Sequence, residues 1–528
     1  MFTTLAGAFS GKMVRWRQPI DSDETFELEH QAALLRKSSD TTPTCPRNAL
    51  LSYIRPCVKS RGAKKRRSGY RRALRFTALL VGGFVLVSLL EGVLFPSYQR
   101  PPRHYHELRQ AILASTRSGR GNQENEKIFI AANIINEELI RGPWGTSLLE
   151  LIDILGEQNV FVSIYENDSG IGTRDALREL QKKLPCNSSV VAGDHLLISE
   201  LPKVTTPSGE HRVKRIAYLA EVRNRALRPL NGSYVPDSGQ VGFRHASTKF
   251  DRVLFLNDIF FSAEEAAQLI FSTNHGQYRA ACAVDFVSKV MFYDTFVVRD
   301  KEGYGMGLMF YPWFSSSGSA QSRRAVLAGE DAVPVRSCWG GLAAFDAAMF
   351  QTADAQRGGY ALALQFSYTA EAFWEAAECC LIFAAMEQAH GSTLAAGGSG
   401  VYVNPFVRVS YTAGTWRWLG FFRRFERAFR NLQYLVSRIG YPEYNPRRRD
   451  EPGQLVQHRV WTTGAAGGGG VVHAGRGGRS SGSFHTVERR AGLGGFCGQR
   501  RMFLMKPDVQ AANRRGEKNW EKVPVPGR

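Results

Sequence analysis

A single uninterrupted apolar segment, residues 76–95 (FTALLVGGFVLVSLLEGVLF), restricts what this chain can fold into more than any other feature. It has 20 residues and one charge, Glu91, near its far end. A helix of that length spans roughly 30 Å, the thickness of the hydrocarbon core of a bilayer. A cleaved signal peptide is disfavoured because 75 residues precede the segment and no clear small-residue cleavage site follows it. A buried core helix is disfavoured by the basic residues before it and by Pro96 after it, so we expect a transmembrane helix.

A cluster of basic residues directly precedes this segment and predicts its orientation. Its nine members, with no acidic residue among them, are Lys59, Arg61, Lys64, Lys65, Arg66, Arg67, Arg71, Arg72 and Arg75. Basic residues that flank a membrane span stay in the cytoplasm, so the N-terminus is expected there and everything after about residue 96 in the lumen. We therefore expect a single-pass type II membrane protein.

The formal net charge of +20 does not by itself indicate a nucleic-acid partner. Much of the positive charge lies in the cluster just named and in the Arg- and Gly-rich C-terminal part, with mixed charge between them. A nucleic-acid-binding domain would carry a basic stripe with interleaved aromatic residues on its folded surface. We expect no nucleic-acid partner; the opposite hypothesis predicts salt-dependent binding by the lumenal domain.

Composition divides the chain into five parts. We expect a disordered basic cytosolic tail (1–75), a transmembrane signal-anchor helix (76–95), a stem (96–126), a lumenal globular domain (127–450) and a Gly- and Arg-rich, largely disordered tail (451–528). The last part holds 16 glycines, a bias typical of poorly ordered chains.

Cysteines and glycosylation sequons are compatible with a lumenal domain. Six cysteines follow the membrane segment: Cys186, Cys282, Cys338, Cys379, Cys380 and Cys497. An even number in an oxidising compartment favours disulfides, whose pairing the sequence leaves open. For Cys338, Cys379 and Cys380 we expect structural disulfides rather than nucleophiles. Sequons begin at Asn167, Asn187 and Asn231.

The globular part alternates between two periodicities. Apolar runs of strand length occur at 127–133, 160–165 and 250–256, and amphipathic helical patterns lie between them, including Ile216–Leu227. Strands that alternate with helices of this length predict βαβ units and a mostly parallel sheet. Such sheets bind ligands beyond the carboxyl ends of their strands. The expected fold class is α/β.

Two polar groups stand where this fold would place a ligand. Asn257 and Asp258 end the strand at 250–256, and Arg223, Asn224 and Arg225 lie on the preceding helix. Taken singly, Arg-Asn-Arg on a helix is more often a solvated face, and Asn-Asp after a strand is more often a turn or a cap. Together, in this order, they supply cations for a diphosphate and a carboxylate for a divalent metal. This favours a nucleotide-sugar transferase with a GT-A-like domain, although the usual Asp-x-Asp is here Leu-Asn-Asp.

Many blocks in consistent order resemble one family, the fungal capsule-associated α-1,3-mannosyltransferases (glycosyltransferase family 69). They are FIAAN (129–133), SIYENDSG (163–170), RNRALRPL (223–230), FLND (255–258), ACAVDF (281–286), YDTFVVRD (293–300), VRSCWGG (335–341), ECCL (378–381) and NPFVRVSY (404–411). Residues 494–501 are a further short match. The resemblance implies a Golgi membrane enzyme that uses GDP-mannose, with Mn²⁺, to build α-1,3-mannosyl linkages on a glycan or polysaccharide acceptor.

The resemblance also assigns roles to individual residues. Asp258 would hold the metal on the diphosphate, with Asn257 beside it, and Arg223, Asn224 and Arg225 would contact the donor. Glu166 and Asp168 lie where a donor-recognition loop is expected. Asp285, Asp294 and Glu378 are the remaining candidates for catalysis or for binding acceptor hydroxyls, although Glu378 could equally be an ion-paired helix residue.

Two alternatives stay open. The same scaffold could use another donor, such as GDP-fucose, UDP-galactose or UDP-xylose. The domain could also be a non-catalytic lumenal subunit of a polysaccharide-assembly complex that binds glycan only. The variant Asp258→Ala separates an enzyme from a binding subunit, because only the enzyme would lose its function while staying folded.

Overall fold

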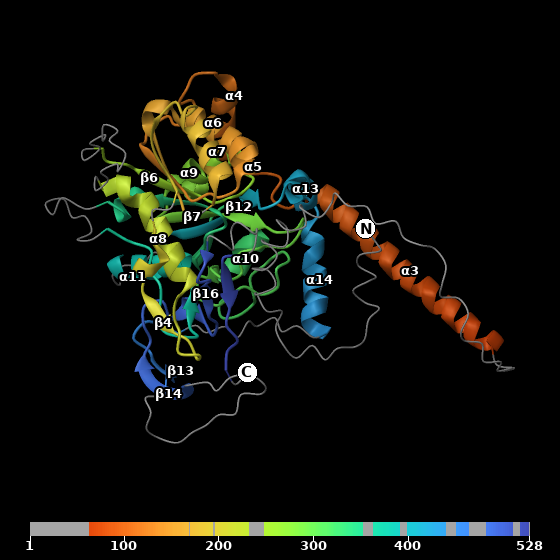
Figure 1. The fold of residues 1–528 in the computed structure, drawn as a ribbon. Coiled ribbons are helices and arrows are strands. Elements are labelled where there is room, and N and C mark those ends of the chain that lie inside the picture. Colours follow the sequence, from red (N-terminus) through yellow and green to blue (C-terminus); the bar gives the residue numbers. More distant parts are fainter. Residues whose placement is uncertain are drawn as a thin grey trace, which may run out of the picture.

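The computed structural model describes residues 63–167, 169–193, 196–231, 248–351, 363–390, 399–439, 450–463, 482–509 and 518–526. Within them, a large α/β domain carries one long helix that extends away from it (Figure 1). Of the expected site residues, Asp168 lies outside the described ranges.

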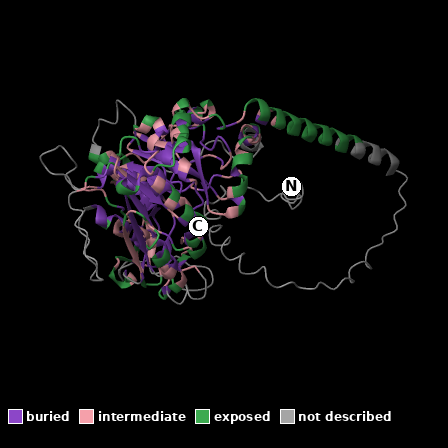
Figure 2. Cartoon of the chain, turned by 90° about the horizontal axis from the view of Figure 1, so that it is seen from above, coloured by how far each residue is buried: buried purple, intermediate pink, exposed green. Residues whose placement is uncertain are grey.

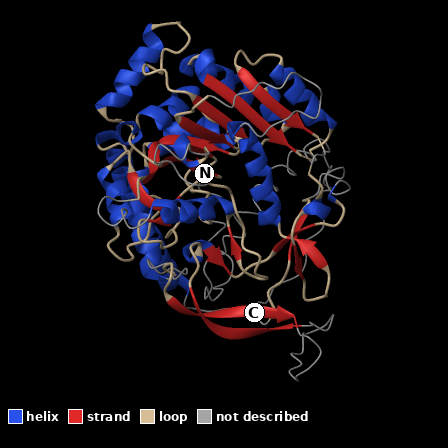
Figure 3. Cartoon of the chain, turned by 90° about the vertical axis from the view of Figure 1, so that its left-hand side faces the viewer, coloured by secondary structure: helices blue, strands red, loops and turns tan. Residues whose placement is uncertain are grey.

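A nine-stranded sheet in the order β3-β2-β1-β6-β10-β7-β12-β9-β8 forms the centre of the domain (Figure 3). Its strands are β1 (Ile128–Ala132), β2 (Val160–Glu166), β3 (Asn187–Ala192), β6 (Arg252–Leu256), β7 (Ala280–Phe286), β8 (Arg299–Asp300), β9 (Val333–Ser337), β10 (Leu342–Asp346) and β12 (Val401–Ser410). Only β10 and β9 run antiparallel to their neighbours, so the other seven strands of this sheet point the same way. The predicted α/β class with a mostly parallel sheet is confirmed, and the strands expected at 127–133, 160–165 and 250–256 are β1, β2 and β6.

Helices cover both faces of the sheet because its strands are apolar on both sides. Along β1, Ile128 and Ile130 belong to one buried cluster, and Phe129 and Ala131 belong to the other, as the two-residue repeat of a strand requires. The first face packs against α5 (Glu137–Arg141), α6 (Pro143–Leu155), α7 (Ile171–Gln181) and α9 (Ala263–Phe271). The second packs against α8 (Arg215–Leu227), α10 (Gln321–Ala328) and α11 (Glu378–His390). The helix expected at Ile216–Leu227 is α8.

The segment expected to be a stem is partly built into the domain. Its helix α4 (Arg103–Ala114) buries Tyr105 and Ile112, which belong to the two core clusters. The Tyr105 hydroxyl donates to Asp331 at 3.2 Å and accepts from the amide of Asn404 at 2.7 Å. The packed domain therefore begins before residue 127.

The long helix α3 (Ala63–Leu94) contains the expected membrane segment. Its stretch Leu74–Leu94 has 21 residues and a mean hydropathy of 2.1, which is long and apolar enough to cross a membrane. Nearly all of this stretch is exposed, and Figure 2 shows it leaving the buried core. An apolar helix in this position is what a membrane anchor requires.

The expectation of a largely disordered tail at 451–528 is wrong for its described residues. These form β13 (Leu455–Thr463), β14 (Gly482–Arg490), β15 (Gly498–Gln499), β16 (Phe503–Met505) and β17 (Trp520–Lys522). Strand β15 pairs with β11 (Glu375–Ala376), and an isolated bridge joins Lys214 to Leu504, next to the pair β4 (Lys203–Thr205) and β5 (His211–Val213). Buried Phe496, Leu504 and Met505 give this part an apolar anchorage that its high glycine content concealed.

Two further helices follow the last long strand, β12. They are α13 (Ala413–Arg423) and α14 (Glu426–Ile439). Both lie at the base of α3 in Figure 1, and α14 contacts α3 directly. The chain thus returns to the root of the apolar helix after completing the sheet.

Candidate functional site

The candidate site lies at the edge of the sheet where β6 and β7 end and β10 begins. Because β10 is antiparallel to β6, Leu342 at its start pairs with Leu256 at the end of β6. The turn before β10, residues 339–341, is thereby set beside Asn257 and Asp258, and the Asn257 N–H donates to the Gly341 carbonyl at 2.9 Å. Open α/β sheets bind their ligands at this kind of edge.

Arg223 from α8 links this edge to the start of α11. Its Nε donates to Glu378 at 2.9 Å and its terminal nitrogen donates to the Asn257 amide oxygen at 3.2 Å, while its guanidinium lies 4.4 Å from the Trp339 ring centre. The side chains of Arg223 and Glu378 are only 11% and 4% exposed. Burial opposes the charge on Arg223, but Cys379 and Glu378 outweigh it and raise the pKa of the guanidinium. A buried cation thus stays charged within a hydrogen-bonded network.

Asp285 and Asp294 form a second acidic group beside this ion pair. The Asp285 carboxylate, fully buried at the end of β7, accepts from the Asp294 N–H at 3.1 Å and from the Tyr411 hydroxyl at 3.2 Å. The pKa of Asp294 is raised to about 6, mainly by burial and in smaller part by the charge of Glu378, while hydrogen bonds from Val297 and Gly340 and the charge of Arg299 work against the shift. A carboxyl group with such a pKa can exchange a proton near neutral pH.

The turn at 339–341 needs glycine to bring its backbone into the site. Gly340 has a φ of +61° and Gly341 a φ of +66°. A Cβ on Gly340 would lie 2.0 Å from the carbonyl oxygen of Ala283, so a side chain there cannot fit without displacing backbone. The Gly340 N–H donates to Asp294 at 3.4 Å, which ties this turn to the acidic group.

Asp258 faces the loop that follows β1. Its carboxylate accepts from the Ile135 N–H at 3.1 Å, and it is partly exposed. The described residues contain no group of three or more His, Cys, Asp or Glu side chains arranged around a metal. Of the two residues expected at a metal, Asn257 has its amide oxygen bonded to Arg223, and Asp258 is the one that carries a carboxylate. A hard divalent cation suits one such oxygen ligand when phosphate oxygens and water complete its coordination.

Other expected donor-binding residues are not brought into this group. Asn224 donates to and accepts from the backbone of Phe366, and Arg225 donates to Glu221 and to the Tyr165 hydroxyl. Arg223 and Arg225 are two positions apart, which places them on different sides of the helix. Glu166 is buried and accepts from the backbone N–H groups of Ser169 and Gly193, so in this structure it holds the loop after β2.

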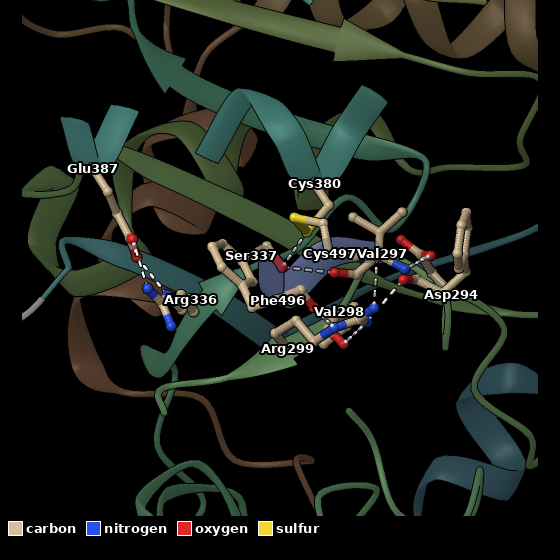
Figure 4. Close-up of a disulfide and its surroundings, with 11 residues drawn as sticks. Asp294, Val297, Val298, Arg299, Arg336, Ser337, Cys380, Glu387, Phe496 and Cys497 are labelled. Carbon is tan, nitrogen blue, oxygen red and sulfur yellow. Dashed lines mark hydrogen bonds and ion pairs between the residues drawn. A yellow bond between two sulfur atoms is a disulfide. The ribbon is translucent and has the colours of Figure 1, made fainter. Parts of the chain in front are cut away.

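A C-terminal segment holds the loop of Asp294 in place (Figure 4). Arg299, only 1% exposed, donates to the carbonyls of Phe496 and Cys497 at 2.9 and 3.2 Å, and also to the carbonyls of Phe296 and Val298. Cys497 in turn forms a disulfide with Cys380, two residues after Glu378. Residues 496–497 therefore tie together the loop that carries Asp294 and the helix that carries Glu378.

The disulfides correct one cysteine expectation. Cys338 pairs with Cys282, and Cys380 pairs with Cys497, as structural bridges. Cys379, also expected in a bridge, is a free buried thiol. Its Sγ donates to Glu378 at 3.2 Å, which directs it into the site instead of toward another cysteine.

Sequence reasoning did not single out Tyr411, Arg299 or Cys497 as part of the site. Each nevertheless lies in a block that carries the family resemblance: 404–411, 293–300 and 494–501. Their partners are distant in the chain, such as Asp285 for Tyr411, so only the fold reveals the contacts.

Comparisons with known proteins agree with the resemblance. The model of a family described as Cryptococcal mannosyltransferase 1 matches residues 127–385. No curated protein matches the chain significantly.

Solved structures give distant likenesses. A mannosyltransferase from Pyrobaculum calidifontis in complex with GDP-Man and Mn²⁺ is 12% identical, covering 69% of this chain and 77% of its own, with a TM-score of 0.29. Glucosyl-3-phosphoglycerate synthase from Mycobacterium tuberculosis, solved with Mn²⁺, UDP and glucosyl-3-phosphoglycerate, is 13% identical. The match covers 74% of this chain and 96% of the synthase, with a TM-score of 0.29. Mannosyl-3-phosphoglycerate synthase from Rubrobacter xylanophilus is 12% identical. The match covers 75% of this chain and 93% of that synthase, with a TM-score of 0.25.

Proposed function

Residues 127–385 belong to the family of Cryptococcal mannosyltransferase 1, and from this premise we propose the function of the chain. It is a type II Golgi membrane enzyme that transfers mannose from GDP-mannose to a glycan or polysaccharide acceptor, forming an α-1,3 linkage. Its globular domain faces the lumen, and α3 is the membrane anchor.

The observation that carries this proposal is the assembly of Asp258, Arg223, Glu378 and Asp294 at one sheet edge. These residues come from two helices and two loops that are far apart in sequence, yet a hydrogen bond connects Arg223 to Glu378, and the charge of Glu378 acts on Asp294. A transferase needs a cation-binding carboxylate, a fixed positive charge and a group that accepts a proton, and this edge supplies all three.

The roles follow from the positions. Asp258 would hold Mn²⁺, which neutralises charge on the departing diphosphate when bound. Arg223 remains positively charged and is fixed by Asn257 and Glu378, so it stabilises negative charge without having to reorganise. As the acceptor oxygen bonds to the anomeric carbon and the bond to the diphosphate breaks, Asp294 takes the proton of the acceptor hydroxyl. Asp285 positions Asp294 because its carboxylate accepts a hydrogen bond from the Asp294 N–H.

Trp339 gives independent support for a ligand at this edge. Its indole N–H is buried and has no acceptor among the described residues. A buried donor without an acceptor costs about 1–3 kcal/mol, so its presence beside Arg223 suits a site in which a ligand oxygen completes the bond.

A donor screen on the full-length protein in detergent tests the proposal. GDP-mannose, GDP-fucose, UDP-galactose and UDP-xylose are supplied with and without Mn²⁺ and with glycan acceptors, and released nucleoside diphosphate is measured. We expect release from GDP-mannose with Mn²⁺, a loss of at least a hundredfold in Asp258→Asn, and normal activity in the control Glu124→Gln, which changes an exposed carboxylate. Release from another donor would correct the sugar, and no release from any donor would favour the glycan-binding subunit.

A further inference from the structure

An exposed aromatic face on α13 lies next to the end of α3. Trp418 and Phe421 are 45% and 56% exposed, which is unusual for such large apolar side chains on a folded domain. Their ring centres are 5.9 Å apart, and the Phe421 ring lies 5.2 Å from that of Phe425. Phe425 lies two residues beyond the end of α13 and is half-buried; the rings of Trp418, Phe421 and Phe425 are here called the α13 aromatic face.

This face is joined directly to the end of the apolar helix. Arg424, just past α13, donates from Nε to the carbonyl of Gly92 at 2.8 Å, and the Ser97 N–H donates to the Arg424 carbonyl at 3.5 Å. A Cβ on Gly92 would lie 2.2 Å from the ring of Phe425, so the two segments are in close contact there. The α13 aromatic face therefore begins where α3 emerges.

Positive charge accompanies the aromatic rings. Lys289 places its ammonium 5.5 Å from the ring centres of both Trp418 and Phe422. Arg417 is exposed on α13 itself, and the sequence of α13, AGTWRWLGFFR, contains no acidic residue. Aromatic rings and cations on one short surface are the combination that interfacial membrane helices use for the headgroup region and for anionic lipids.

We propose that α13 is a membrane-surface helix that inserts Trp418 and Phe421, with Phe425 just beyond its end, into the lumenal headgroup layer of the bilayer. This inference rests on the proposed anchoring by α3. If α3 spans the bilayer, its end at Leu94 lies at the lumenal interface, and the contacts to Gly92 and Ser97 hold α13 at that depth. A helix of 11 residues covers about 16 Å, too short to span the bilayer and suited to lie along its surface.

Docking of α13 would also fix the site relative to the membrane. Tyr411, whose hydroxyl donates to Asp285, is separated from α13 only by its N-cap, Thr412. The Thr412 side chain accepts from the Thr415 N–H, which makes a rigid junction. The acidic group of the site is thereby held at a set height above the lipid surface, which suits an acceptor that is itself presented near the membrane.

Tryptophan quenching by brominated lipid tests this inference on the full-length protein. The protein is reconstituted into vesicles of phosphatidylcholine and phosphatidylglycerol with bromine near the headgroup end of the acyl chains. We expect wild type to show a quenched component that disappears in Trp418→Phe. The matched control is Trp416→Phe on the same helix, because Trp416 packs against both core clusters and its removal should leave that component in place.

Alkaline carbonate extraction of the same vesicles separates the two hypotheses. Protein that stays in the membrane pellet but is quenched equally in wild type and Trp418→Phe overturns docking by α13 and leaves the anchor intact. That result would assign the aromatic face to a protein partner or a second copy instead. Protein that carbonate releases refutes the anchor, and the inference falls with it.

Discussion

Replacing Glu378 by glutamine should reveal whether the buried ion pair with Arg223 controls both stability and proton transfer. The substitution keeps the size of the side chain and an oxygen for the Arg223 Nε, but it removes the only negative charge that the described structure bonds directly to that guanidinium. Both side chains are almost fully buried, so solvent cannot replace the missing charge. The loss should lower the free energy of unfolding by about 2–5 kcal/mol. A hydrogen bond to a charged group contributes about 1.5–3 kcal/mol, and a buried charge left without its partner costs about 3–5 kcal/mol.

The same substitution should move the acidic limb of the pH–activity profile. The negative charge of Glu378 is one cause of the raised pKa of Asp294, which is about 6. If Asp294 accepts the acceptor proton, activity falls as the pH drops through that pKa. Removing the charge lowers the pKa of Asp294, so in Glu378→Gln the limb should lie at lower pH than in wild type.

The matched control is Glu387→Gln on the same helix. Glu387 pairs with Arg336 at 2.9 Å, but its side chain is 24% exposed and Arg336 keeps a second carboxylate, Glu451, at 3.0 Å. We expect a stability loss of about 0–1 kcal/mol there and an unchanged acidic limb. Urea unfolding and initial rates of diphosphate release between pH 4.5 and pH 8, a range that brackets the pKa of Asp294, measure both quantities. The reasoning is refuted if the limb stays in place in Glu378→Gln, or if Glu387→Gln moves it as far.

Three further outcomes are expected. In Asp294→Asn the transfer rate should fall at least a hundredfold. The pKa of Asp294 is raised in the folded state to about 6 from 3.8, so its contribution to stability is present below pH 4 and is lost as the pH rises through 6. Urea unfolding of this variant should therefore lack that part of the pH dependence. Cys497→Ser should reduce the free energy of unfolding by about 2–5 kcal/mol and lower activity. Cys186→Ser, which changes a free thiol, should do neither. Equal effects of the two substitutions would show that the bridge to Cys380 is not what holds the site. Gly340→Ala should destabilise the fold by more than about 1–2 kcal/mol and abolish transfer. Gly329→Ala is the control, because Gly329 has a similar positive φ but open space around it, so this variant should cost only the conformational strain. Thermal unfolding of the two variants compares their losses of stability.

The parts of this fold that sequence alone predicts are those set by local patterns. Buried strands β1, β2 and β6 are continuous apolar runs, and α8 has a clear helical repeat, so their positions follow from periodicity. Asn257 and Asp258 follow one of these runs directly. Their place at the ligand-binding edge could be predicted because parallel strands end at a common edge.

The remaining parts depend on contacts between distant segments. The side of α8 that faces the site was not evident, because Arg223 and Arg225 are both basic and only the partners Glu378 and Tyr165 distinguish them. Cys379 and Cys380 are neighbours in sequence, but the geometry of one helix start turns only Cys380 toward Cys497. Glycine content suggested disorder at the C-terminal end, where a few buried side chains and one disulfide are enough to order the described residues.

The contacts of Arg299 imply that the matched family region does not complete the site by itself. Residues 127–385 contain Asp294, Arg299 and Glu378, but the carbonyls of Phe496 and Cys497 that bind the Arg299 guanidinium lie more than a hundred residues later. Without that segment, a guanidinium that is only 1% exposed would lose two of its acceptors, and the loop from Asp294 to Arg299 would lose part of its support. A chain that ends near residue 450 should therefore keep the pairing of its nine-stranded sheet, but the segment from Asp294 to Arg299 would lose its contacts to Phe496 and Cys497. The C-terminal segment is thus a structural requirement for the chemistry proposed at the sheet edge.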